Sequence, residues 1–167
     1  ILPIYEGTTA IQANDLVFRK TIRDNGAAVN SLLDDIDNEM ATLANHHNTE
    51  IVKASKSIIE ANNTARKVAA HILGGANTPR RPAASGSNYL MLLGTLCGGW
   101  LMTRSGAAAA NALAKGETGA IGNDDFMKIK LTTMQIYITH HLPKISGLAC
   151  TITDGDNPAL AMQPDWL

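Results

Sequence analysis

The sequence predicts an all-α fold, an up-down helical bundle of about four long helices preceded by one shorter helix. Three observations carry this prediction. Aromatic residues make up only 4% of the 167 residues and valine occurs four times, whereas strands favour these residue types. Alanine and leucine are abundant instead. Apolar residues recur three and four positions apart over several long segments, as the core-facing side of a helix requires.

Two helices are expected in the first 48 residues. The first begins at Thr9, with Thr8 or Thr9 as its N-cap, and runs for about 15 residues until Asn25-Gly26 interrupts it. The second carries an apolar stripe from Val29 onward, with acidic residues largely on its other side, and ends near residues 45–48.

Two further helices follow, separated by a segment rich in glycine and proline. The third helix begins near Thr49 and keeps its period until Gly74-Gly75. Residues 74–86 contain three glycines and two prolines, which predicts a long irregular connection. The fourth helix is expected from about Ser87 to Lys115. Its apolar residues surround the cylinder, so it is the expected central helix, and its glycines would let a neighbouring helix approach closely.

The fifth helix is expected to begin near Asp124 and to end at Asp154-Gly155, with a kink at Pro143. An irregular tail follows, and its apolar end is expected to dock on the bundle.

Composition limits the function classes. The net charge of −1 argues against a nucleic-acid-binding protein, which usually carries a basic surface. The most apolar window, residues 88–103, is shorter than the roughly 20 residues that cross a bilayer, so no membrane span is expected. No signal-peptide pattern is visible, and Cys97 and Cys150 read as two buried thiols more readily than as a disulfide. We therefore expect a cytoplasmic protein.

The bundle helices show no catalytic pattern of their own. His46-His47 and His140-His141 are adjacent pairs whose side chains diverge by about 100° on a helix, so no metal site is predicted. Arg80-Arg81 is either a solvated loop tip or a phosphate contact. The chemistry must be sought elsewhere in the chain.

The segment "ILPIYEGTTAIQ" (residues 1–12) has two interpretations. It reads as an ordinary capped helix start with a solvated Glu6. It also reads as a site, because the apolar residues before Glu6 would desolvate its carboxylate and raise its pKa toward that of a general base. Gly7 would leave room for a flat ligand, and the following helix start would favour an anion.

A family resemblance favours the second interpretation. "PIYEGTTAIQANDLVFRK" (residues 3–20) resembles the C-terminal signature of the acyl-CoA dehydrogenases, where Ile-Tyr-Glu-Gly-Thr-x-x-Ile-Gln opens the last helix of the catalytic domain. Seven positions match in order: Ile4, Tyr5, Glu6, Gly7, Thr8, Ile11 and Gln12. The remainder is similar, more loosely, to a helical extension found in a longer bacterial branch of this family.

The resemblance implies specific roles for these residues. Glu6 would be the catalytic base that takes the α-proton of an acyl-CoA while the β-hydride passes to N5 of FAD. The backbone N–H of Glu6 would bind the thioester carbonyl and stabilise the enolate. Gly7 and Thr8 would lie against FAD, and Tyr5 together with Glu6 would bind the substrate. Ala10 stands where many members carry Gln, so one flavin contact of the family is not expected here.

The resemblance also implies an organisation and partners. Residues 1–24 would be the last segment of the catalytic domain, and residues 25–167 a C-terminal helical-bundle extension. The rest of this enzyme of fatty acid metabolism would precede Ile1, so the chain alone is expected to bind no FAD and to be inactive. Acyl-CoA, an electron-transfer flavoprotein and further copies of the chain would be its partners. Two alternatives stay open: a purely structural or oligomerisation domain, and a free-standing binding protein in which the match is accidental.

Overall fold

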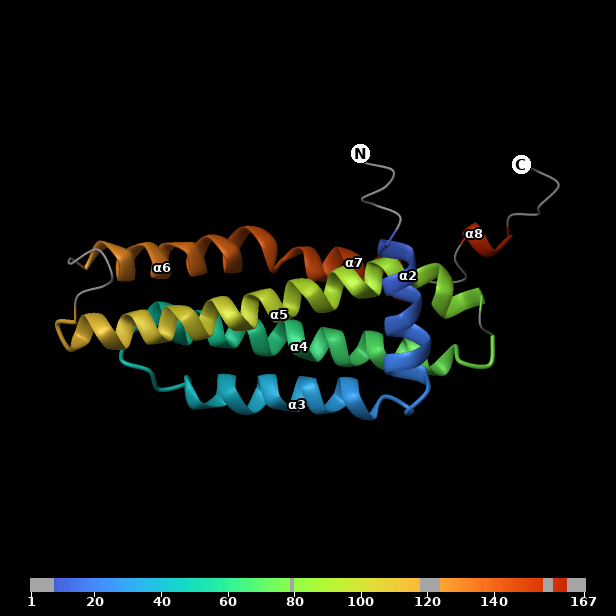
Figure 1. Ribbon diagram of the computed structural model, residues 1–167, viewed down its shortest axis with the longest axis horizontal. Coiled ribbons are helices and arrows are strands. Elements are labelled where there is room, and N and C mark those ends of the chain that lie inside the picture. The colour runs from blue at the N-terminus through green and yellow to red at the C-terminus, as the bar shows by residue number, and fades with distance from the viewer. Residues whose placement is uncertain (1–7, 79, 118–123, 155–157, 162–167) are drawn as a thin grey trace.

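The computed structural model describes residues 8–78, 80–117, 124–154 and 158–161. These residues form a bundle in which each long helix runs antiparallel to the next, and no strand occurs among them (Figure 1). The predicted all-α, up-down architecture is confirmed. In chain order the elements are α2 (Thr9–Asn14), the π-helix η1 (Asp15–Ile22), α3 (Ala27–Thr42), α4 (Thr49–Gly74), α5 (Arg80–Ala114), α6 (Asp125–Ile136), the π-helix η2 (Tyr137–His141), α7 (Lys144–Thr153) and α8 (Pro158–Ala161).

The core lies between α3, α4, α5 and α7. The apolar stripe predicted on the second helix faces it, because residues three and four apart share one face of a helix. Leu33, Ile36 and Met40 of α3 are fully buried there. The other largest buried side chains of this cluster come from the facing helices and include Ile58, Ile72, Tyr89, Leu92, Leu96 and Ile145.

Helix α5 is the central helix, as predicted, because it packs against α2, α4, α6 and α7. Gly98, Gly99 and Gly106 lie where these neighbours approach. A Cβ atom added at Gly98 would overlap the ring of Tyr137, and one added at Gly99 would lie 2.7 Å from Cδ1 of Ile58. The absence of side chains at these glycines therefore sets the distance between α5 and its neighbours.

Gly94 of α5 does not share this role. It is exposed, and a Cβ atom added there would meet nothing within 4 Å. The expectation of a close helix contact at every glycine of α5 is therefore wrong at this position within the described residues.

Two ion-pair clusters tie the helices together across the surface. Glu39 of α3 accepts hydrogen bonds from Nε and Nη2 of Arg104 and, at 2.8 Å, from Nε1 of Trp100, both on α5. Arg66 of α4 lies 2.8 Å from the carboxylate of Asp37 of α3. The Arg66–Asp37 pair joins α3 and α4, which also pack against each other, whereas Glu39 links α3 to α5 across the surface.

The prediction of an irregular connection over residues 74–86 is wrong for its second half, which is helical. Helix α4 ends at Gly74, but α5 already begins at Arg80 and includes Pro82 and Gly86. Proline is tolerated in the first turn of a helix because the N–H group that it lacks would have no intrahelical partner there. The connection is consequently a short turn, in which the N–H of Arg81 donates to the carbonyl of Thr78 at 2.9 Å.

The first predicted helix is present but is not α-helical throughout. It begins at Thr9 as α2 and continues as η1, whose end is marked by a bond from the N–H of Gly26 to the carbonyl of Thr21, five residues earlier (2.8 Å). Asn25 and Gly26 have positive φ values of 52° and 81°, which ends the helix as predicted. This segment crosses the long helices at one end of the bundle (Figure 1).

The fifth predicted helix is broken where the sequence indicates. Helix α6 passes into η2, and α7 begins after Pro143, with the N–H of Leu142 bonded to the carbonyl of Tyr137 at 3.0 Å. The tail is not wholly irregular, because residues 158–161 form α8, which packs against α5. The docking expected of residues 166–167 lies outside the described residues.

Candidate functional site

The motif that carries the predicted site lies at the start of α2. Tyr5, Glu6 and Gly7 fall outside the described residues, so their roles stay predictions. Thr8 is the N-cap residue of α2, one of the two positions expected. Its φ and ψ of −93° and −21° are helical, its side chain makes no capping hydrogen bond, and it is exposed. The Thr8 hydroxyl is therefore free for an external partner.

The helical segment formed by α2 and η1 is held by its inner face. Ala13 and Val17 are buried against Gly86 of α5, where an added Cβ atom would lie 3.5 Å and 3.6 Å from their side chains. Further along, the hydroxyl groups of Thr21 and Tyr89 lie 3.3 Å apart in the core. Burial raises the pKa of Tyr89, so this phenol stays protonated and hydrogen-bonded. The bundle thereby fixes the helix that follows the motif.

The outer face of the same segment is open. A shallow groove is lined by Ile11, Gln12, Asp15, Leu16, Arg19, Lys20 and Leu90. Ile11 is 69% exposed, although it is one of the motif positions. Arg19 is paired with Asp15 at 2.8 Å, one helical turn away. The groove offers apolar surface and one basic edge but no pair of groups suited to proton transfer.

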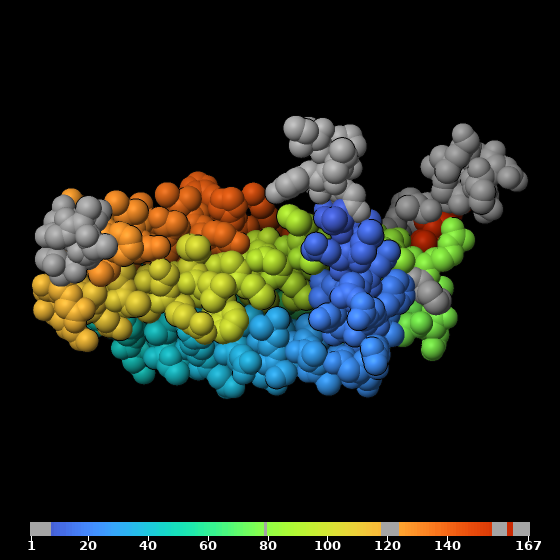
Figure 2. Space-filling model, in the orientation of Figure 1, coloured from blue at the N-terminus to red at the C-terminus, as the bar shows by residue number. Residues whose placement is uncertain are grey.

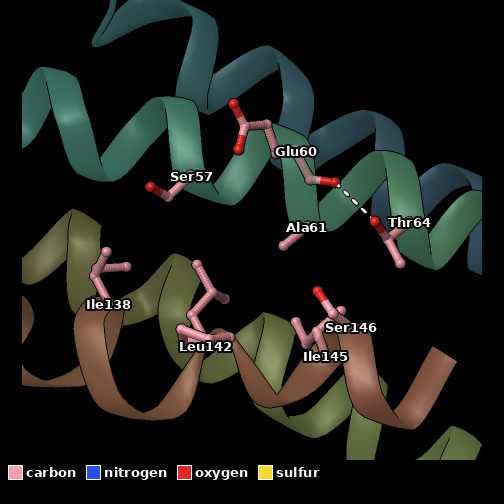
Figure 3. Close-up of a pocket in the computed structure, with 9 residues that line it drawn as sticks. Ser57, Glu60, Ala61, Thr64, Ile138, Leu142, Ile145 and Ser146 are labelled. Carbon is pink, nitrogen blue, oxygen red and sulfur yellow. Dashed lines mark hydrogen bonds between the residues drawn. The ribbon is translucent and has the colours of Figure 1, made fainter. Parts of the chain in front are cut away.

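A second concavity lies between α4 and the broken helix, a cavity of about 330 Å³ (Figure 3). Ser57, Glu60 and Thr64 line its α4 side, and Leu142 and Ser146 line the other. The Thr64 hydroxyl donates to the Glu60 carbonyl at 3.1 Å, and the Ser146 side chain points toward α4, whereas the Glu60 carboxylate points away from α7 (Figure 3). The arrangement brings no base to a nucleophile. Sequence reasoning missed this cavity, for which the kink at Pro143 is the nearest signal.

Three of the five histidines make local contacts. His46 accepts a hydrogen bond at Nδ1 from the N–H of Asn48 (3.1 Å) and contacts Oδ1 of Asn111 through Nε2 (3.2 Å). His47 stacks on His46, and His141 stacks on Tyr137. In the part of the chain that the structure describes, no three His, Cys, Asp or Glu side chains gather as a metal site would need.

The two cysteines are free thiols, as expected, but they are not both buried. Burial raises the pKa of Cys97, which lowers its reactivity. Cys150 is exposed, which corrects the prediction of two buried thiols. Its neighbours in sequence are apolar, but the helical period directs its side chain away from the core.

The bundle belongs to a known class of helical domain. Residues 32–163 match the family described as "Acetyl-CoA dehydrogenase C-terminal like". Because this match covers most of the chain, the chain belongs to that family. None of the described helices has the length and hydropathy that a bilayer-spanning segment needs.

Two curated relatives extend the similarity over nearly the whole chain. The 3-methylmercaptopropionyl-CoA dehydrogenase of Ruegeria pomeroyi is 37% identical over 163 residues, 94% of this chain. The broad-specificity linear acyl-CoA dehydrogenase FadE5 of Mycobacterium tuberculosis is 29% identical over 164 residues, 95% of this chain. The resemblance to acyl-CoA dehydrogenases is thus confirmed. The matched region is 26% of the length of each relative.

Proposed function

We propose that this chain is the C-terminal part of an FAD-dependent acyl-CoA dehydrogenase and that Glu6 accepts the α-proton of the acyl-CoA. The observation that carries the proposal is the Tyr-Glu-Gly-Thr motif, which leads directly into a helix anchored on a bundle of the matching family. A base must be held in a fixed position relative to the C–H bond that it breaks. The burial of Ala13 on α2 and of Val17 on η1 supports this role, since it anchors the helical segment that follows the motif.

The neighbouring residues are assigned around this base. The backbone N–H of Glu6 would donate to the thioester carbonyl and stabilise negative charge on its oxygen. Tyr5 would close one side of the acyl-thioester site. When bound, FAD supplies the acceptor for the β-hydride. Gly7 and Thr8 would hold it, and the uncapped, exposed Thr8 hydroxyl fits a polar contact with such a group.

The domain boundary and the partners belong to the same proposal. Residues 1–24 would complete the catalytic domain and residues 25–167 would form its extension. The expected partners are an acyl-CoA substrate, an electron-transfer flavoprotein as electron acceptor and further copies of the chain. The free thiols support a cytoplasmic location. We propose that the 167-residue chain alone neither binds FAD nor dehydrogenates acyl-CoA. Stoichiometric flavin absorbance in the purified chain would contradict this proposal.

The decisive experiment replaces the base in the whole protein. Glu6→Gln should lower turnover by about 10²- to 10⁴-fold, the range of general base catalysis, while the flavin absorbance stays unchanged. Glu60→Gln is the matched control, because this carboxylate lines the cavity between α4 and α7 and should leave turnover intact. Turnover that survives Glu6→Gln would reject Glu6 as the base.

A second candidate function is structural. Several large apolar side chains remain exposed on α2, α5 and α6, which favours a packing or assembly role for the bundle. Truncation of the whole protein after Arg23 should then lower its melting temperature or change its oligomeric state. Unchanged melting and sedimentation would argue against this role.

A further inference from the structure

Exposed apolar side chains are unevenly distributed over the bundle. Among the described residues, the large hydrophobic side chains with about half or more of their surface exposed lie on α2, α5 and α6, and none lies on α3, α4 or α7: Ile11 (69%), Met91 (56%), Leu101 (47%), Ile129 (57%) and Ile136 (51%). Such a concentration on one set of helices is typical of a surface that another protein element covers.

Helix α5 carries no charged side chain between Arg81 and Arg104, because residues 82–103 contain no Asp, Glu, Lys or Arg. Ser87, Met91, Gly94 and Leu101 are nevertheless exposed, and their spacing of four, three and seven residues places them on one face. By contrast, the exposed positions of α4 include Lys53, Lys56, Glu60 and Lys67. In Figure 2, α5 forms the middle of the visible face, between α6 and α3.

Gly94 supplies an independent observation on this face. Glycine is unfavourable within a helix, and the neighbouring Gly98, Gly99 and Gly106 each have an internal contact that accounts for it. Gly94 has none, because an added Cβ atom would meet nothing within 4 Å. A glycine flanked by exposed apolar side chains is what the close approach of a second helix requires.

We propose that this outer face of α5, formed by Ser87, Met91, Gly94 and Leu101, is the surface on which the preceding part of the longer protein packs a helix. The proposal rests on the proposed function, in which the catalytic part of the enzyme leads into Thr8. The two relatives have about three quarters of their length outside the match. The absence of charge fits an apolar occupant.

The position of the chain connection supports the same occupant. The preceding part would join the bundle at α2, where the exposed Ile11 shares a groove with Leu16 and with Leu90 of α5. Leu90 lies four residues before Gly94, one helical turn away, so the groove borders the proposed surface. An element attached at this edge is held at high effective concentration and needs little intrinsic affinity to stay docked.

The test measures thiol labelling in the whole protein. Ser87→Cys places a thiol on the proposed surface, and Ser31→Cys places one on the exposed side of α3 as a matched control. Fragment-ion mass spectrometry separates position 87 from the native Cys97. The thiol at position 87 should react with a maleimide roughly tenfold or more slowly than that at position 31, because an interface core excludes solvent. Equal rates would overturn the proposal.

A substitution of the glycine links the protection to this contact. Gly94→Leu should restore fast labelling at position 87, because the added side chain would block the approaching helix. Gly147→Leu is the control, since Gly147 is also exposed with nothing within 4 Å of an added Cβ atom, and it should leave the protection intact. Protection that survives Gly94→Leu would overturn the proposal.

Cross-linking from position 87 identifies the occupant. A maleimide–diazirine reagent should join this position to peptides that precede Ile1. Links to residues 1–167 of an isotopically distinct second copy would show a contact between copies and overturn the assignment. The readout does not depend on turnover. If Glu6→Gln retains activity while position 87 still links to peptides that precede Ile1, Glu6 is rejected as the base and the proposed docking surface on α5 is supported.

Discussion

Alanine substitutions at two glycines of α5, Gly98 and Gly94, should change the free energy of unfolding in opposite directions. Gly98 lies against Tyr137, whereas a Cβ atom added at Gly94 would meet nothing within 4 Å among the described residues. A Cβ atom at Gly98 would overlap the Tyr137 hydroxyl and would lie 2.8 Å from Cζ of the ring. The ring is rigid, so Gly98→Ala must displace it. The displacement would break the hydrogen bond from the Tyr137 hydroxyl to the carbonyl of Thr95, which is 3.2 Å long.

The magnitude follows from three contributions. Alanine gains about 1 kcal/mol over glycine in a helix interior. Overpacking of a fitted contact costs about 1–3 kcal/mol, and loss of the hydrogen bond costs about 0.5–1.5 kcal/mol. Gly98→Ala should therefore lower the free energy of unfolding by about 0.5–3.5 kcal/mol. Gly94→Ala, one turn earlier in open space, should raise it in the isolated chain by up to about 1 kcal/mol.

Urea unfolding of the 167-residue chain, followed by circular dichroism, measures both variants with unchanged m-values as the check on two-state behaviour. Tyr137→Phe removes the hydroxyl that a Cβ atom at position 98 would overlap most. It should therefore lower the free energy of unfolding less in the Gly98→Ala variant than in the native chain. If Gly98→Ala is as stable as Gly94→Ala, the packing argument for the glycines of α5 is refuted.

Three further predictions concern the core, the ion pairs and the thiols. Leu96→Ala, at a fully buried position, should destabilise the chain by about 2–5 kcal/mol, whereas Leu101→Ala, 47% exposed in the native chain, should change little in the same urea experiment. The Arg104 guanidinium holds the pKa of Glu39 below its ordinary value of 4.5, so the stability that Glu39 contributes is present above that pH and is lost as the pH falls through the lowered pKa. Glu39→Gln should therefore lower the free energy of unfolding at neutral pH and make it fall less steeply as the pH is lowered. An equally steep fall in the variant and in the native chain would contradict this role of Glu39. Cys150 should react with a thiol reagent faster than the half-buried Cys97, as peptide mass spectrometry can measure, and the reverse order would be inconsistent with their exposures.

Features of the fold that depend on residues within one helix can be predicted from the sequence. The stripe of Leu33, Ile36 and Met40 lies within one helix, so its spacing alone predicts which face is buried. The sequence prediction places the start of α5 too late, because proline commonly ends a helix, although a proline in the first turn is compatible with one. The π-helical segments depend on backbone hydrogen bonds shifted by one residue, such as that from the N–H of Leu142 to the carbonyl of Tyr137, which the apolar spacing does not indicate.

The candidate site depends on information of a different kind. Glu6 stands out through its resemblance to a family motif, since the physics of a turn alone favours an ordinary helix cap. The cavity beside Glu60 could not be predicted, because it requires α4 to pair with a helix that begins about eighty residues later in the chain. The sequence does not distinguish Gly94 from Gly98, Gly99 and Gly106, because the difference lies in the side chains that other helices bring to these positions.

The bond between Thr21 and Tyr89 also sets an order of events during synthesis. These residues are 68 positions apart in the chain. At translation rates of roughly 5–20 residues per second, the helix that follows the motif waits about 3–14 seconds before its partner on α5 has even been made. During this interval Ala13 and Val17 lack the surface of α5 that covers them in the folded chain. A nascent chain that stalls before α5 emerges therefore exposes this helix to chaperones and proteases.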